Sequence, residues 1–265
     1  MFFSKNSGTS RVIFLKKPAP SSIYAKDPYY DKVVLLLDFE NGLKDESKYN
    51  HAITTFGPAV TDSDAKFGTK SLSLNGNGQY VEILNSNGAF NFGDQDFTIE
   101  CWVKCPDWFY SMPFVTFVDS NNNGIHWFGG RFSDGPDNGG NTQFADINNN
   151  QYSLLNIFID NYNSNTWYHY AVIRKNDKIY FYIDGVLKTF FVSGIGTRNF
   201  LNINNPLKDI DKIFINRFAF GPGGYLINSF MDNLRITVGH GRYDYPNNFV
   251  PEDFDKYIYT PPVQI

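Results

Sequence analysis

Carboxylates that could take part in acid–base catalysis stand singly on segments that alternate like β-strands. Glu82 lies in "QYVEI" and Glu100 in "FTIECWVKC", and neither segment carries a second carboxylate. A retaining glycoside hydrolase needs two carboxyl groups about 5 Å apart, so these isolated acids do not indicate one. The sequence also lacks a G-x-S-x-G segment that would present a nucleophilic serine. We therefore predict that the chain is not an enzyme.

One segment has the spacing of a calcium loop. In "DSNNNG", residues 119–124, Asp119, Asn121 and Asn123 occupy alternate positions, as oxygen ligands of a hard cation do. The twelfth position of an EF-hand carries a bidentate glutamate, but here it is Gly130. A polar hairpin loop is the alternative prediction for this segment.

The two cysteines, Cys101 and Cys105, are four residues apart in an alternating segment. On a strand this spacing separates them by roughly 13 Å, which is too far for a disulfide. The histidines form no closely spaced pair that would complete a zinc site. We expect two free thiols and no zinc.

Composition favours strands joined by turns. Aromatic residues make up 18% of the 265 residues, and the chain is rich in Asn, Gly and Asp. The formal net charge is −4, and the basic residues form no stripe that would neutralise phosphates, so nucleic acid is not an expected partner. The apolar run Val12–Leu15 is too short for a membrane span or the core of a signal peptide. On this basis we expect a protein that stays in the cytoplasm where it is made.

The alternation of residues predicts specific strands and faces. "VVLLLDF" is a continuous apolar run, typical of a strand buried on both faces. Residues 167–191 predict a β-meander with a hairpin turn at Asp184-Gly185. In this meander Trp167, His169, Ala171 and Ile173 are expected on one face of the first strand, and Ile179, Phe181 and Ile183 on the core face of the second. The other face is expected to be half exposed and to carry four tyrosines: Tyr168, Tyr170, Tyr180 and Tyr182.

Residues 1–30 read as an extended arm, because "KKPAPSSIYAKDPYY" is rich in Pro, Ser and Lys and has no sustained period. Two alternatives stand for this arm: it packs across its own domain, or it docks onto a partner chain. Its candidate interface residues are Arg11, Lys16, Lys17, Tyr24, Tyr29 and Tyr30.

Five segments in order carry a family resemblance: "LLLDFENGLKDESKYNH", "FGTKSLSLNGNGQYVEI", "DFTIECWVK", "NTWYHYAVIRKNDKIYFYIDGVLKT" and "MDNLRITVGHGRYDYPNNFVPED". Together they resemble concanavalin A-like, laminin-G-like jelly-roll domains. The resemblance implies an all-β fold, a two-sheet antiparallel jelly-roll sandwich over residues 31–254. The extended N-terminal arm and an extended tail, residues 255–265, lie outside it.

The ending "DNLRIT…GRY…NNFVPED" resembles the version of this domain found in bacteriophage virion proteins. That resemblance implies a virion location, other virion proteins of capsid or tail as partners, and several copies or a homo-oligomer in one assembly. The missing export signal agrees with assembly in a host cytoplasm. The expected function is a non-enzymatic, capsid-decorating or tail-attached structural module that makes contacts through its arm.

The resemblance also implies sites. Related jelly rolls often hold a structural Ca²⁺ between an early and a late acidic residue, and the matching positions are Asp38, Asp45 and Asp232. The alternative is that these residues only begin turns and strands. Glycoside hydrolases of this fold resemble one another in a Glu-x-Asp-x-x-Glu strand, which this sequence lacks.

A Gly-rich segment, residues 124–144, suggests the second functional class, a lectin-like host-surface adhesion protein. Aromatic rings stack on sugars, while polar side chains bind hydroxyls. The candidate glycan-binding residues are His126, Trp127, Arg131 and Asn138, expected in an exposed loop.

Overall fold

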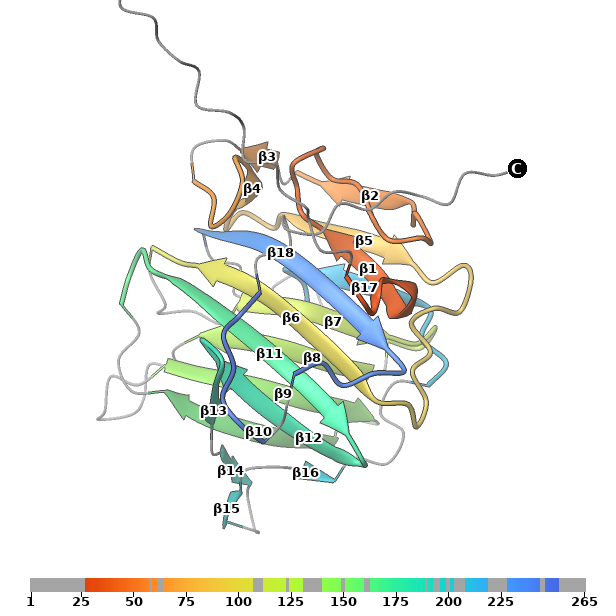
Figure 1. The fold of residues 1–265 in the computed structure, drawn as a ribbon. Helices are drawn as coiled ribbons and strands as arrows, with labels where there is room; N and C mark the ends of the chain where they lie inside the picture. The colour runs from red at the N-terminus through yellow and green to blue at the C-terminus, as the bar shows by residue number, and fades with distance from the viewer. Residues whose placement is uncertain are drawn as a thin grey trace, which may run out of the picture.

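The computed structural model describes residues 27–57, 59–61, 64–106, 112–122, 124–130, 140–148, 151–159, 163–188, 190–192, 196–198, 201–202, 208–218, 228–243 and 246–252. These residues form two antiparallel β-sheets stacked face to face (Figure 1). Their only helical element is a single 3₁₀ turn, η1 (Tyr30–Lys32). The predicted jelly-roll sandwich is confirmed.

Sheet A contains the middle of the chain together with strands from near both ends. Its strands are paired in the order β13 (Val186–Lys188), β12 (Lys178–Ile183), β11 (Trp167–Lys175), β6 (Phe97–Lys104), β18 (Asn228–Val238), β4 (Ser71–Asn75) and β3 (Ala59–Thr61). Two further strands pair outside this order: β1 (Val33–Leu37) with β18, and β16 (Leu201–Asn202) with β12. The predicted meander is therefore β11–β12–β13, with its turn at Asp184-Gly185.

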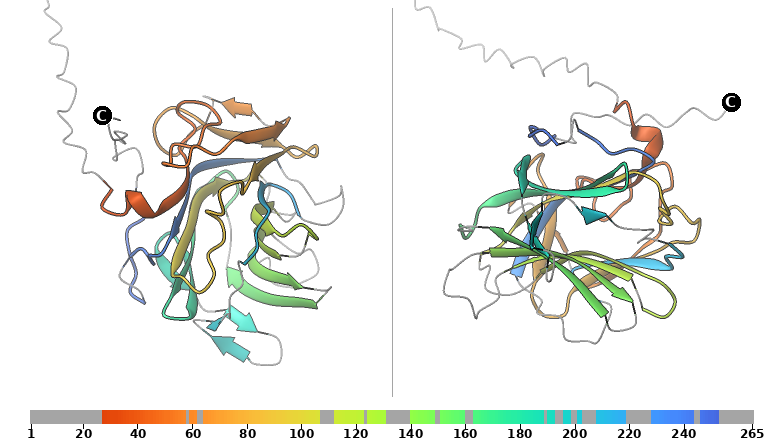
Figure 2. Two further views of the ribbon diagram at one scale, coloured as in Figure 1. Left: turned by 90° about the vertical axis from the view of Figure 1, so that its right-hand side faces the viewer. Right: turned by 90° about the horizontal axis from the view of Figure 1, so that it is seen from below.

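Sheet B lies behind sheet A in Figure 1, and Figure 2 shows the two layers from below. Its order is β15 (Gly196–Arg198), β14 (Phe190–Val192), β10 (Gln151–Ile159), β9 (Gly140–Asn148), β8 (Gly124–Gly130), β7 (Met112–Val118), β17 (Lys212–Ile215), β5 (Tyr80–Leu84) and β2 (Ile53–Phe56). The turn between β4 and β5 moves the chain from one sheet to the other.

The core lies between the sheets and is built from one face of each strand. On β6 these residues are Phe97, Ile99, Cys101 and Val103, as the alternation predicts. Cys101 and Cys105 are free and buried, so the prediction of two free thiols is confirmed. Burial raises the pKa of the Cys101 thiol well above its ordinary value, which leaves it protonated and unreactive at neutral pH.

Sheet A is unusual because its outer face is also buried. On β6 the outward residues Thr98, Glu100 and Trp102 are each less than a tenth exposed. Residues 64–70 cover part of this face and lie over β18 and β6. Residues 239–243 and 246–252, dark blue in Figure 2, cross the outside of the sheet. None of the described residues forms a helix long and apolar enough to cross a membrane.

The predicted arm begins outside the described residues, which start at Asp27. Its last residues, 27–30, pack onto the domain, and Asp27 and Tyr30 are buried. The Tyr30 hydroxyl donates to the Glu46 carbonyl at 2.6 Å. Arg11, Lys16, Lys17 and Tyr24 lie outside the described residues, so their interface role stays a prediction.

Candidate binding surface

The predicted glycan-binding residues do not form an exposed loop. His126 and Trp127 lie on β8, and their side chains are 0% and 1% exposed. Trp127 packs edge-to-face on Phe114 in the core, at 5.3 Å between ring centroids. The expectation that these two residues present a sugar platform is therefore wrong, because β8 is an inner strand of sheet B that is paired on both sides. Arg131 and Asn138 lie outside the described residues.

The three predicted calcium ligands each have local partners. Asp45 is buried and accepts hydrogen bonds from the backbone amides of Leu36, Ser47 and His51. Asp232 is also buried and accepts from the amides of Lys66 and Phe67. Asp45 therefore holds a turn, and Asp232 holds the loop that covers sheet A.

No group of three metal-ligating side chains comes together anywhere in the described part of the chain. Asp38 accepts a hydrogen bond from the Glu40 amide, and desolvation raises its pKa. Asp119 caps the turn between β7 and β8 by accepting from the Asn121 amide at 2.8 Å. The hairpin alternative for this segment is confirmed, and calcium binding stays a prediction without a preformed site.

The tyrosines of the meander lie on two different faces. Tyr170 belongs to the core between the sheets, whereas Tyr180 and Tyr182 lie on the outer face with Ala171 and Ile173. Tyr170, Tyr180 and Tyr182 are at most 5% exposed. The expectation of one half-exposed face with four tyrosines is wrong, because the pairing of β11 with β12 sets Tyr170 opposite Ile183 and Tyr182 opposite Ala171.

A buried polar network explains why the outer face of sheet A is covered. Glu100 on β6 accepts hydrogen bonds from the Arg235 guanidinium at 2.7 and 2.9 Å and from the Tyr243 hydroxyl at 2.6 Å. A β-bulge in β18, at Asp232 to Arg235, places the arginine over the glutamate. The Arg235 charge holds the pKa of Glu100 well below its ordinary value despite complete burial.

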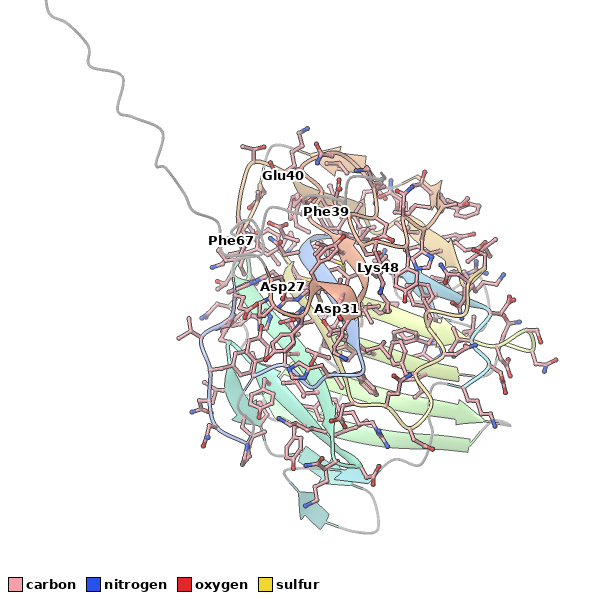
Figure 3. The ribbon with its side chains drawn as sticks, turned by 45° about the vertical axis from the view of Figure 1, so that its right-hand side comes forward. Asp27, Asp31, Phe39, Glu40, Lys48 and Phe67 are labelled. Atoms are coloured by element: carbon pink, nitrogen blue, oxygen red, sulfur yellow. The ribbon has the colours of Figure 1, made fainter. Side chains whose placement is uncertain are left out.

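The same network joins the two ends of the described chain. Arg242 pairs with Asp27 at 2.7 Å, and Arg235 pairs with Glu252 at 2.8 Å. Arg235 also lies 3.6 Å from Asp27, and Arg242 lies 3.8 Å from Glu252. Figure 3 shows Asp27 beside the η1 turn, where β18 passes behind it. We call these five residues, Asp27, Glu100, Arg235, Arg242 and Glu252, the terminal clasp.

The terminal clasp makes Glu100, the strongest catalytic candidate, unsuitable for catalysis. Glu100 is 0% exposed and is paired with a cation, so it can neither reach a substrate nor hold a proton at neutral pH. Its neighbour His169 lies 3.3 Å away and is likewise fully buried. Glu82 belongs to sheet B and faces the opposite side of the sandwich. The two strand carboxylates therefore cannot act as a pair.

An exposed aromatic surface lies on the outer face of sheet B, near its β2 edge. Phe56 on β2 stands opposite Tyr80 on β5, and the two rings stack at 4.2 Å with an interplanar angle of 12°. The Arg217 guanidinium lies 4.5 Å from the Tyr80 ring centre and 4.6 Å from that of Phe214. Phe56 is 42% exposed. We call Phe56, Tyr80, Phe214 and Arg217 the aromatic platform.

Polar and apolar side chains border the aromatic platform on the same face. Val81 and Ile83 of β5 point into the core, so Glu82 and Leu84 point outward with Tyr80. Lys212 on β17 lies 3.8 Å from Glu82, and Leu84 is 50% exposed. This face thus combines two exposed apolar side chains, Phe56 and Leu84, with charged groups, and we treat it as the candidate binding surface.

A model of a known protein family matches part of this chain. Residues 75–205 match the model described as the concanavalin A-like lectin/glucanases superfamily. The fold of this chain is therefore that of a concanavalin A-like sandwich. This confirms the resemblance found in the sequence. A comparison with curated proteins gives no significant match.

Among the solved structures that resemble this chain are binding domains of toxins. They include the binding domain of Paraclostridial mosquitocidal protein 1 (18% identity, TM-score 0.57), covering 79% of this chain and 49% of that one. The binding domain of botulinum neurotoxin DC, in complex with rat synaptotagmin II, has 21% identity and TM-score 0.54, with coverages of 79% and 48%. A structure of botulinum neurotoxin type C, whose cell entry depends on two ganglioside molecules, has 19% identity and TM-score 0.56, also with 79% and 48% coverage. This chain spans about half the length of these structures, and the likeness is one of fold.

Sequence reasoning did not identify either the terminal clasp or the aromatic platform of this concanavalin A-like domain. Phe56 and Phe214 are separated by 158 positions, and Asp27 and Arg242 by 215, and no local pattern links such residues. One signal was available for the platform. Phe56 is the one apolar residue on the outward side of the edge strand "ITTF". Edge strands usually carry polar or charged residues on that side, so Phe56 departs from the expected pattern.

Proposed function

We propose that this chain is a non-enzymatic binding module that recognises a surface glycan on the aromatic platform. The exposed Phe56 ring, backed by Tyr80 and the Arg217 guanidinium, carries the proposal. Sugars present apolar C–H faces that pack on such rings, and a ring already fixed by stacking loses little freedom on binding. Glu100 is buried, and Glu82 lies on the other sheet, so the two carboxylates cannot act as a catalytic pair, which supports a binding role over hydrolysis.

The test measures glycan binding by Phe56→Ala. We expect the wild-type chain to bind at least one member of a panel of neutral and acidic glycans, and the variant to bind it about tenfold more weakly, because an aromatic anchor contributes roughly 1 kcal/mol or more. Val186→Ala is the matched control, since Val186 is also 42% exposed but lies on β13 of sheet A. Equal loss in both variants, or no binding to any glycan, would reject the proposal.

A second candidate is a bacteriophage virion component that docks through its terminal segments. The terminal clasp favours it, because Asp27 and Glu252 meet at Arg235 and Arg242 on the outer face of sheet A. The segments before residue 27 and after residue 252 therefore continue from neighbouring points. The aromatic platform lies on the outer face of sheet B, so docking and glycan recognition would use opposite sides of the sandwich. The two functions are compatible in one protein.

A further inference from the structure

Arg217 carries a charge that the neighbouring side chains do not neutralise. Of the residues described by the structure, no carboxylate lies within ion-pair distance of its guanidinium, which instead rests on Tyr80 and Phe214. Lys212, on the same face, lies 3.8 Å from Glu82 and 3.9 Å from Asp211. Within the described part of the chain, carboxylates therefore balance the lysine charge but not the arginine charge.

The backbone around Arg217 holds this guanidinium in place. The Thr116 hydroxyl donates to the Arg217 carbonyl at 2.6 Å. The preceding residue, Asn216, is buried; its amide donates to the Pro113 carbonyl and its side chain to the Gln79 carbonyl, both at 2.8 Å. These contacts tie the arginine to β7 and β5, so its position is fixed before any ligand arrives.

A fixed, partly buried guanidinium on aromatic rings suits a planar anion. Guanidinium groups are weakly hydrated, cannot lose their charge in proteins, and bind carboxylates through two parallel hydrogen bonds. The exposed Phe56 ring, which contacts Tyr80 as the guanidinium does, offers a partner for an apolar surface on the same face of the sheet. A sugar acid has a carboxylate that can pair with the guanidinium and an apolar ring face that can pack on Phe56.

We infer that the aromatic platform selects acidic sugars, with Arg217 as the residue that determines this specificity. The carboxylate of a uronic or sialic acid pairs with Arg217, and the apolar face of the sugar packs on Phe56. This inference rests on the proposed glycan-binding function. It adds the chemical class of the ligand and assigns a role to a residue that makes no contribution to the core.

The test compares acidic sugars with their own neutral esters. Oligogalacturonate and sialyllactose are titrated into the full-length chain beside their methyl esters, which keep the ring and remove the charge. The variants are Arg217→Met, which keeps the packing of the stem, and Lys188→Met on β13 of sheet A, which removes a cation from the other sheet. Thermal unfolding of each variant shows that it is folded.

We expect the acids to bind about tenfold or more tightly than the esters, with a dependence on ionic strength. Arg217→Met should remove this preference by weakening acid binding to about the level of ester binding, and Lys188→Met should keep the preference. If acids and esters bind equally to the wild-type chain, the acidic specificity is wrong while glycan binding stands. If poly-glutamate binds as tightly as the sugar acids, the sugar part of the inference is wrong. If neither acids nor esters bind, but neutral glycans bind through Phe56, Arg217 has no such role.

Discussion

At the scale of single residues, His126 shows what burial on the outer face of sheet B does to a titratable group. The ring is 0% exposed, lies 5.5 Å from the Phe218 ring, and has Thr116 as a neighbour at 3.2 Å. Burial lowers the pKa of His126 to about 3, so the folded protein keeps this ring neutral. The unfolded chain binds a proton near the ordinary value of 6.5. The stability that neutral His126 contributes is therefore present above pH 6.5 and is lost as the pH falls towards 3.

We expect His126→Gln to weaken the acid sensitivity of the fold. Between pH 6.5 and pH 3 the unfolded chain binds one proton at this ring that the folded protein does not bind. This proton lowers the free energy of unfolding by about 1.4 kcal/mol for each unit by which the pH falls, and the variant lacks this contribution. Denaturant unfolding at several values between pH 7 and pH 4 gives the slope. His240→Gln is the comparison, because His240 is a partly exposed ring on the covering segment of sheet A. A slope in His126→Gln equal to that of the wild-type chain would contradict the assignment.

At the scale of elements, residues 239–243 and 246–252, the covering segment, are attached to sheet A by several kinds of contact. Phe249 stacks on Tyr243 at 3.7 Å and contacts Tyr182 at 4.9 Å. Its amide donates to the Gly185 carbonyl, and the Asn248 side chain accepts from the Leu187 amide. The segment therefore packs on the β12–β13 hairpin and buries the aromatic outer face that would otherwise be open to solvent.

At Gly185 the backbone lies so close to the covering segment that there is no room for a side chain. Its φ is +72°, and an added Cβ would lie 1.8 Å from the Phe249 carbonyl oxygen. We expect Gly185→Ala to displace residues 246–252, with faster hydrogen exchange at the Phe249 amide and a loss of stability clearly above 1 kcal/mol.

Gly42→Ala is the matched control for Gly185→Ala. Gly42 has a φ of +85° but nothing within 4 Å of an added Cβ, so its variant meets only the cost of the left-handed backbone, about 1 kcal/mol. Equal losses of stability in the two variants, with unchanged exchange at Phe249, would show that the segment does not depend on this close approach.

At the scale of the whole molecule, the sandwich separates its two candidate surfaces. The terminal clasp lies outside sheet A, and the aromatic platform lies outside sheet B, with the main core between them. Asp27 and Glu252 are held by the same two arginines, so the first and last described residues lie on one side of the domain. A module attached in this way would present the aromatic platform away from the surface that carries it.

The virion hypothesis predicts that attachment depends on the segment before the clasp. We expect the full-length chain to bind phage particles that lack it, and a chain beginning at Asp27 to bind them far more weakly while keeping its glycan affinity. Co-sedimentation with the particles measures attachment, and Phe56→Ala in the full-length chain is the control that should still attach. Equal sedimentation of the full and shortened chains would reject docking through residues 1–26.

Local patterns in the sequence were sufficient for several strands and for the state of the cysteines, and the resemblance to concanavalin A-like domains was sufficient for the fold. The runs at Val33–Leu37 and Phe97–Lys104, the turn at Asp184-Gly185 and the distance between Cys101 and Cys105 follow from local rules of alternation, turn geometry and reach. These rules involve only neighbours along the chain, which is why the predictions hold.

Only the tertiary structure decided which faces are open. Alternation separates the two faces of β11 but does not say which one meets sheet B, so Tyr170 was placed on the wrong side. Whether Glu100 is exposed depends on Tyr243 and Arg235, which are more than 130 positions away in the sequence. The aromatic platform forms because β2, β5 and β17 pair side by side in sheet B, although β17 is far from the other two in the sequence. Both candidate surfaces lie on outer faces, and contacts between distant segments, which no local pattern encodes, decide which parts of those faces are open.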